Sequence, residues 1–152
     1  MANEFLTKKV VKINYTWNGT DSQGVANSTV ATHGTGVFIP SGAVITDAWI
    51  NVTTTMGPSG TGTLALQALA ANDLVSAIAI NDGTTPWNAG VRGTLVTAPN
   101  LGADSAHDSA LETIALFAAT KIVMTSTQEV KVVIGTAALT SGAMDIYIEY
   151  LS

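Results

Sequence analysis

The sequence contains no cysteine, so neither a disulfide nor a thiolate metal site can stabilise the fold. Charged residues are also scarce: they make up 11% of the chain, whereas about 25% is usual for a soluble domain. With only two histidines as well, there are few groups from which an acid, a base or a nucleophile could be assembled. We therefore expect packing to hold the fold together, and we do not expect an enzyme.

Positively charged residues are scarcer than negatively charged ones. The chain has six Lys and Arg against eleven Asp and Glu, which gives a formal net charge of −5. Binding to a phosphate backbone requires clustered Lys and Arg, so direct contact with nucleic acid is not expected. Three of the basic residues, Lys8, Lys9 and Lys12, lie near the start of the chain. They predict either a solvated first strand or a basic docking arm, in which case these lysines are candidate contact residues.

Long apolar runs are absent. The longest, residues 114–119, is far shorter than the roughly 20 residues that a membrane-spanning helix needs. The opening residues lack the apolar stretch of a secretory signal, and we expect no membrane partner. A length of 152 residues allows one complete core but not two. We therefore predict a basic arm and the start of the first strand in residues 1–12, followed by a single domain in residues 13–152.

The chain is rich instead in alternating apolar and polar positions, which is the pattern of half-buried β-strands. The clearest examples are residues 11–17, 43–54 and 144–150. Weaker strand-like segments follow the same pattern: residues 37–39, 63–69, 74–80, 95–97, 121–125 and 130–136. The last two of these predict a hairpin joined by residues 126–129. Many short strands in one domain predict an all-β fold, an antiparallel β-sandwich, of which the jelly roll is the commonest eight-stranded version.

Two corners have nearly the same sequence, Ser-Gly-Ala at residues 41–43 and again at residues 141–143. We expect similar turn geometry at both.

His33 lies in a glycine-rich stretch with no nucleophile motif around it, and we interpret it as a loop histidine.

The segment 104–119 is the one place where a short helix competes with a strand, because apolar residues recur there at helical spacing. On such a helix, Asp104, Asp108 and Glu112 would share one face beside His107 and could bind a divalent cation. Clusters of Asp and Ser also simply begin helices. We therefore assign no metal and no cofactor to the chain.

Tryptophans supply the remaining candidates for contact. On the strand over residues 43–54, strict alternation predicts a core face and a more polar outer face. The predicted core face holds Val44, Ala48, Ile50 and Val52, and the predicted outer face holds Ile45, Asp47, Trp49 and Asn51. A tryptophan on the polar face needs a covering surface, from another molecule or from a loop of the same chain. Trp49, together with Trp87 in a predicted loop, is thus a candidate interface residue.

Three blocks of sequence resemble a known family. One is Ile-Pro-Ser-Gly-Ala-Val-Ile-Thr-Asp-Ala-Trp-Ile-Asn-Val-Thr-Thr at residues 39–54. The second is residues 71–80 with Pro-Trp-Asn-Ala-Gly at 86–90, and the third is residues 138–142 leading into Ile-Tyr-Ile-Glu-Tyr at 146–150. Together they look like the small head proteins of tailed bacteriophages, which include capsid decoration, or cement, proteins.

The resemblance brings no catalytic motif with it. It implies a sandwich that binds the outer surface of a virion shell, with the major capsid protein as partner, often as a homotrimer, after assembly in the host cytoplasm. The low charge fits such a role, because burying large surfaces then costs less desolvation. The alternative is a phage fibre, spike or collar component whose sandwich loops bind a receptor or a glycan.

Overall fold

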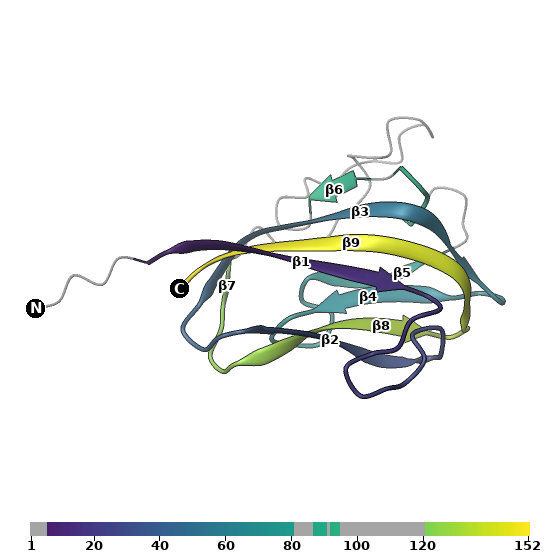
Figure 1. Cartoon of the computed structure of the whole chain (residues 1–152), viewed down its shortest axis with the longest axis horizontal. Coiled ribbons are helices and arrows are strands. Elements are labelled where there is room, and N and C mark those ends of the chain that lie inside the picture. Colours follow the sequence, from purple (N-terminus) through teal and green to yellow (C-terminus); the bar gives the residue numbers. More distant parts are fainter. Residues whose placement is uncertain (1–5, 81–86, 91, 95–120) are drawn as a thin grey trace, which may run out of the picture.

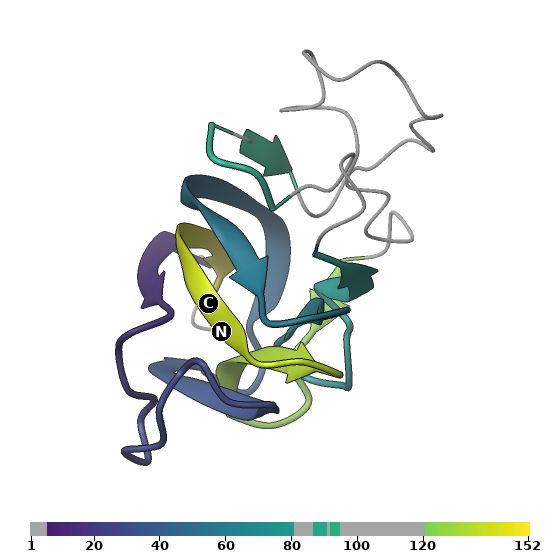
Figure 2. The same ribbon diagram turned by 90° about the vertical axis from the view of Figure 1, so that its right-hand side faces the viewer.

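The architecture is that of two β-sheets packed face to face (Figures 1 and 2). The computed structural model describes residues 6–80, 87–90, 92–94 and 121–152. The first sheet has the order β1 (Lys8–Thr16), β9 (Leu139–Leu151), β3 (Val44–Pro58) and β6 (Arg92–Thr94), with β7 (Ile122–Val123) also paired to β3. The second sheet has the order β2 (Ala31–Ile39), β8 (Gln128–Gly135), β4 (Thr63–Gln67) and β5 (Val75–Ala79). All pairs are antiparallel. The predicted all-β sandwich is confirmed, and its jelly-roll topology stays a prediction.

The space between the sheets is filled by the apolar residues that alternation predicts. Ile146 lies opposite Ile13 on one side and Ile50 on the other, and all three are at most 3% exposed. The second sheet contributes Leu64 opposite Ile134 and Leu66 opposite Val132, which are also buried. Each large apolar side chain that is fully buried stabilises the fold by about 1.5–3 kcal/mol. These rows explain how a chain without cross-links holds two sheets together.

A bulge in β3 overturns part of the predicted face assignment. The pairing with β9 shifts between Ile45 and Asp47, and one extra residue exchanges the two faces of a strand at that point. Ile45 is therefore fully buried and Val44 is only partly so, the reverse of the prediction. Beyond the bulge, the predicted parity holds.

The hairpin predicted over residues 121–136 is wrong. β7 pairs with β3, with Val123 opposite Val44, whereas β8 pairs with β2 and β4 in the other sheet. The chain crosses between the sheets at Met124, which is 1% exposed. Its backbone N–H donates to Ala43 O at 2.8 Å, and its carbonyl accepts from Gly42 N at 2.7 Å. A buried anchor, rather than a tight turn, thus joins the two strands.

The two Ser-Gly-Ala corners also differ, contrary to expectation. Gly42 has φ +82° in the turn between β2 and β3, with open space beside it. Gly142 has φ +135° and lies inside β9. A Cβ at Gly142 would stand 3.0 Å from the Met56 Cα and closer still to the Met56 sulfur. The first glycine serves a turn, and the second lets two strands approach each other.

Several sequence predictions fall outside the described residues: the strand over 95–97, the helix over 104–119 and the acidic cluster with His107. β6 lies immediately before the first of these. Within the described ranges, no helix is long and apolar enough to cross a membrane.

Candidate functional site

The outer face of the first sheet, turned away from the second sheet, brings together residues from β1, β9 and β3. Strand pairing places Lys12 opposite Tyr147, and Tyr147 opposite Trp49. The next outer row places Asn14 opposite Asp145, and Asp145 opposite Asn51. Directly opposite residues share one face of a sheet and lie close enough to interact. We use the name outer face for these two rows together with Glu149 and Lys8.

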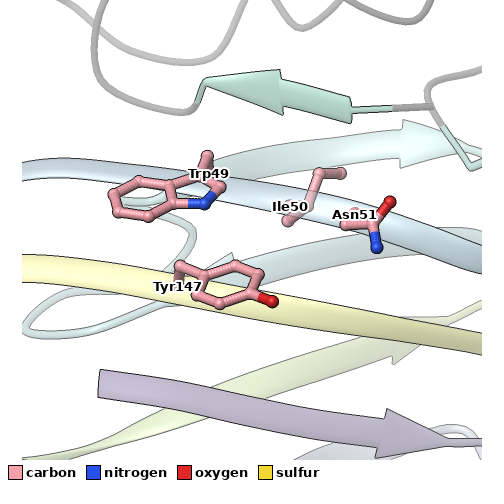
Figure 3. Close-up of a pocket in the computed structure, with 4 residues that line it drawn as sticks. All are labelled: Trp49, Ile50, Asn51 and Tyr147. Atoms are coloured by element: carbon pink, nitrogen blue, oxygen red, sulfur yellow. The ribbon is translucent and has the colours of Figure 1, made fainter. Parts of the chain in front are cut away.

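An aromatic pair occupies the middle of the outer face. The ring centroids of Trp49 and Tyr147 are 5.3 Å apart, and the ring planes differ by 7°. Figure 3 shows the two rings side by side over the neighbouring strands β3 and β9. Both side chains are half-buried. A pair of this kind contributes about 0.5–1.5 kcal/mol beyond its buried area, and it gives the sheet a flat, rigid apolar surface.

A shallow hollow of about 300 Å³ lies beside this pair. It is lined by Trp49, Ile50, Asn51 and Tyr147 (Figure 3). Ile50 is otherwise a core residue with no exposed surface, so the part of the hollow open to contact is formed by two rings and one amide. This combination of a flat apolar surface with a polar group beside it is typical of a contact site rather than of a catalytic pocket.

The charges next to the aromatic pair compensate each other. Lys12 Nζ donates to Asp145 Oδ2 at 3.0 Å and lies 5.6 Å from the centre of the Tyr147 ring. The other Asp145 oxygen accepts from Asn14 Nδ2. The hydrogen bond to Asp145 raises the pKa of the Lys12 ammonium above its ordinary value. Lys12 is therefore a charged, paired residue beside the rings.

A second ion pair lies farther along the same strands. Lys8 Nζ donates to Glu149 Oε2 at 2.7 Å, and Thr46 Oγ1 donates to Glu149 Oε1 at 2.9 Å. These two hydrogen bonds, that from Lys8 first, hold the pKa of the Glu149 carboxyl below its ordinary value. Two lysines that would make an arm basic are thus neutralised within the sheet.

Residues 8–12 belong to β1. Of the two alternatives that the sequence leaves open, a solvated first strand or a basic docking arm, this position agrees with the first. Lys8 lies opposite Leu151, and the pairing continues at Thr7, whose N–H donates to Ser152 O at 2.8 Å. Lys9 is exposed, and its place opposite Tyr150 puts it on the other face of the strand. A role in contact for Lys8, Lys9 and Lys12 stays a prediction.

Trp87, predicted as an interface residue, is a core residue instead. Its side chain has no exposed surface, and its carbonyl accepts from Met56 N at 2.9 Å. The loop sequence around Trp87 is polar and glycine-rich, so nothing local signals that the ring turns inward. Burial here is set by residues distant in the sequence.

His33 is likewise not a loop residue. It lies in β2, opposite Val132, and has no exposed surface. Its Nδ1 is 3.1 Å from Asp21 Oδ2, and its Nε2 is 2.9 Å from Thr29 O. Alternation predicts only the end of this strand, residues 37–39, because Gly34 and Gly36 interrupt the pattern and because the pairing with β8 shifts between Gly34 and Phe38.

In the part of the chain that the structure describes, no three His, Asp or Glu side chains gather as metal ligands do. The acidic cluster at residues 104–112 lies outside that part.

No protein-family model matches the chain, and no curated protein matches it. Solved structures do. A chain of the cyanophage Pam1 capsid asymmetric unit superposes with a TM-score of 0.54 and 15% sequence identity, over 99% of this chain and 89% of that chain. A chain of the acidic stable capsid of Helicobacter pylori bacteriophage KHP30 superposes with a TM-score of 0.53 and 12% identity, over 95% and 87% of the two chains. At the level of the fold, these two phage capsid chains agree with the resemblance that the sequence shows.

Proposed function

We propose that the chain is a structural component of a bacteriophage virion. The observation that carries the proposal is the match in fold, over nearly the whole of both partners, to chains of two phage capsids. The match covers almost nine-tenths of each of these capsid chains and at least 95% of this chain. The two capsid chains are therefore close in length to this chain. The match therefore concerns an entire small capsid component and not one domain of a much larger protein.

Within the virion, the role that fits best is decoration: the protein binds the outer surface of the shell, contacts the major capsid protein and stabilises the particle, as a homotrimer. Two features support it. The chain carries little charge for its size, which lowers the desolvation cost of covering it with protein. Its fold rests on a buried apolar core, so the outer surfaces are not needed to hold the sandwich together.

The outer face of the first sheet is the proposed attachment surface, with Trp49 and Tyr147 at its centre. Aromatic residues are enriched where protein surfaces meet. Since Lys8 and Lys12 are paired with Glu149 and Asp145, the partner surface does not have to supply opposite charge. Attachment should then depend on the rings and respond little to salt, whereas docking through free lysines would weaken strongly as salt rises.

The test is a binding measurement with particles that lack the protein, by co-sedimentation at low and high salt. Trp49→Ala should weaken binding by about tenfold or more, as the loss of a central aromatic contact does. Phe38→Ala is the matched control, because Phe38 is 58% exposed and belongs to the second sheet. Lys9→Glu tests docking through the lysines. Each variant is first checked for unchanged thermal unfolding.

The outcomes separate the claims. Retained binding by Trp49→Ala with loss in Phe38→Ala would move the attachment surface to the second sheet. Loss in Lys9→Glu, together with strong salt dependence, would restore the basic docking arm. If the wild-type chain binds no particle, and if microscopy of purified virions shows no density for it, the virion role itself is wrong.

A second candidate, receptor or glycan binding in a fibre, spike or collar, is favoured by one observation: the flat Trp49–Tyr147 pair beside the Asn51 amide, which matches a sugar ring with an apolar face and polar edges. Titration of the protein with a panel of oligosaccharides would show saturable quenching of tryptophan fluorescence, lost in Trp49→Ala. No saturable change with any of them would exclude this candidate.

A further inference from the structure

The loop that joins β1 to β2, residues 17–30, is fastened to the sandwich by buried polar groups. In Figure 1 it extends below the right-hand end of the sheets, and Figure 2 shows it in front, at the lower left. The Tyr15 hydroxyl donates to Asn27 O at 2.6 Å, and Asn27 Nδ2 donates to Thr16 O at 3.0 Å. Ser22 N donates to Gly34 O at 3.0 Å. The conformation of the loop therefore depends on hydrogen bonds rather than on apolar packing.

His33 contacts this loop through both nitrogens of its ring. Nε2 lies 2.9 Å from the backbone oxygen of Thr29, and a carbonyl oxygen can only accept, so Nε2 carries a proton. Nδ1 lies 3.1 Å from Asp21 Oδ2. The ring has no exposed surface, and the Asp21 side chain is 3% exposed. The ring itself is thus shielded from solvent, and its two contacts with the loop are partly buried.

The protonation state of Asp21 determines whether the second ring nitrogen of His33, Nδ1, must carry a proton. Burial by itself would raise the pKa of the Asp21 carboxyl, but hydrogen bonds from the N–H groups of Val25 and Gln23 and from His33 together lower it below its ordinary value. Both backbone bonds go to Oδ1, at 2.8 Å each. Asp21 is then a carboxylate, and Oδ2 needs a proton from Nδ1. This arrangement satisfies every partner only when His33 is an imidazolium.

We propose that His33 is a proton-dependent clamp: as an imidazolium it holds Asp21 and Thr29 of the loop against β2, and loss of one proton releases the loop. Without that proton, one nitrogen of a ring that has no exposed surface presents a lone pair to an oxygen, and the contact becomes repulsive. The loop is accordingly held at low pH and released as the pH rises.

Other titratable groups near the clamp do not replace His33. Burial, with a smaller contribution from Asp21, raises the pKa of the Tyr15 hydroxyl, so this group stays neutral and bonded to Asn27. On β8, Glu129 Oε1 accepts from Gly36 N at 2.7 Å, and Lys131 lies opposite Gly34, next to His33. Of the charged groups in the described residues, Asp21 is the one bonded to the ring.

The test is an NMR titration of the intact protein from about pH 5 to about pH 9, the range in which histidine switches in proteins. Ring ¹⁵N shifts report the protonation of each nitrogen. The sequence has two histidines, so His107→Gln identifies the signals of His33. We expect the imidazolium pattern at the acid end. As His33 loses its proton, the protection factors of the Gln23 and Val25 amides should fall by about tenfold or more, as for the loss of one charged hydrogen bond.

Amides of the core strand β9, such as that of Ile146, are the internal control and should keep their protection throughout. A ring that stays in one neutral tautomer at every pH would overturn the proposal, and so would loop protection that does not follow the His33 titration.

Two variants refine the test. His33→Gln keeps a donor of similar reach but cannot titrate, so the pH dependence of loop protection should vanish. Asp21→Asn removes the negative charge that faces Nδ1, so the pH dependence of loop protection should weaken. If either variant fails to fold, the wild-type titration still decides the question.

Discussion

The two faces of the first sheet are made by the same strands but are organised differently. On the inner face, Ile13, Ile146 and Ile50 form one row with almost no exposed surface. On the outer face, one residue farther along β9, Tyr147 lies between Lys12 and Trp49, and the row is polar, aromatic and half-exposed. Adjacent residues of one strand therefore belong to separate environments.

This difference separates the residues that stabilise the fold from those proposed for attachment. Burial of apolar area is the main contribution to the free energy of unfolding, and it is concentrated on the inner face. Ion pairs exposed to solvent contribute little to stability, so the outer face can be arranged for a partner without weakening the fold. An inner-face substitution that weakens binding without lowering stability would contradict this separation of the two faces. An outer-face substitution that unfolds the protein would contradict it as well.

The largest effect is expected from Ile146→Ala. Removing a buried isoleucine leaves a cavity between the sheets and should lower the free energy of unfolding by about 2–5 kcal/mol, measured by urea denaturation. Ile146→Val should cost about 0.5–1.5 kcal/mol. The neighbouring change Tyr147→Ala should cost about 1 kcal/mol, from the lost aromatic pair. A larger loss in Tyr147→Ala than in Ile146→Ala would contradict the separation of the two faces.

An intermediate effect is expected from Gly142→Ala, which adds a single methyl group to the inner side of β9. The new Cβ meets Met56 of β3, and overpacking of this kind costs about 1–3 kcal/mol, visible as a lower melting temperature. The matched control is Gly42→Ala, where φ is also positive but nothing lies within 4 Å. Equal losses in the two variants would show that backbone strain alone, and not the contact with Met56, matters at Gly142.

The smallest effect is expected from Lys8→Ala on the outer face. Because the pKa of Glu149 is lower in the folded protein than its ordinary value, the ion pair stabilises the fold at neutral pH, and this contribution disappears as the pH falls through the folded pKa. Lys8 is 64% exposed, so the difference from wild type should be small at pH 7 and absent in acid. Urea midpoints at both pH values measure it. A difference that persists in acid would assign Lys8 a role other than charge.

The strands with regular alternation could be read from the sequence alone. Met144 to Tyr150 is the clearest, because a slip by one residue would exchange Ile146 for Tyr147 in the core. The outer position of Trp49 followed from the same rule. These features depend only on the spacing of apolar residues along one strand, and a period of two is a local property.

Other features depend on contacts between distant segments, and these were missed. The bulge after Ile45 arises in the pairing of β3 with β9, a contact between distant segments. Trp87 is buried by residues distant from its loop. In the sequence, the crossing at Met124 looks like a hairpin because the strands β7 and β8 follow each other closely. However, β7 pairs with β3 in the first sheet, whereas β8 pairs with β2 and β4 in the second. His33 was missed because its partner Asp21 is twelve residues away in a segment without periodicity.

The position of β9 has a consequence for folding on the ribosome. β9 is the central strand between β1 and β3 (Figure 1), yet it is the last of the described strands to be synthesised. Until it emerges, β1 and β3 have no strand to pair with on that side, and their open edges can recruit other chains. Closing the first sheet joins β1 to β9, which are far apart in the sequence, and such a step with high contact order is slow in β-proteins. Expression of this chain should therefore be limited by aggregation of molecules in which β9 is not yet paired rather than by the stability of the folded sandwich.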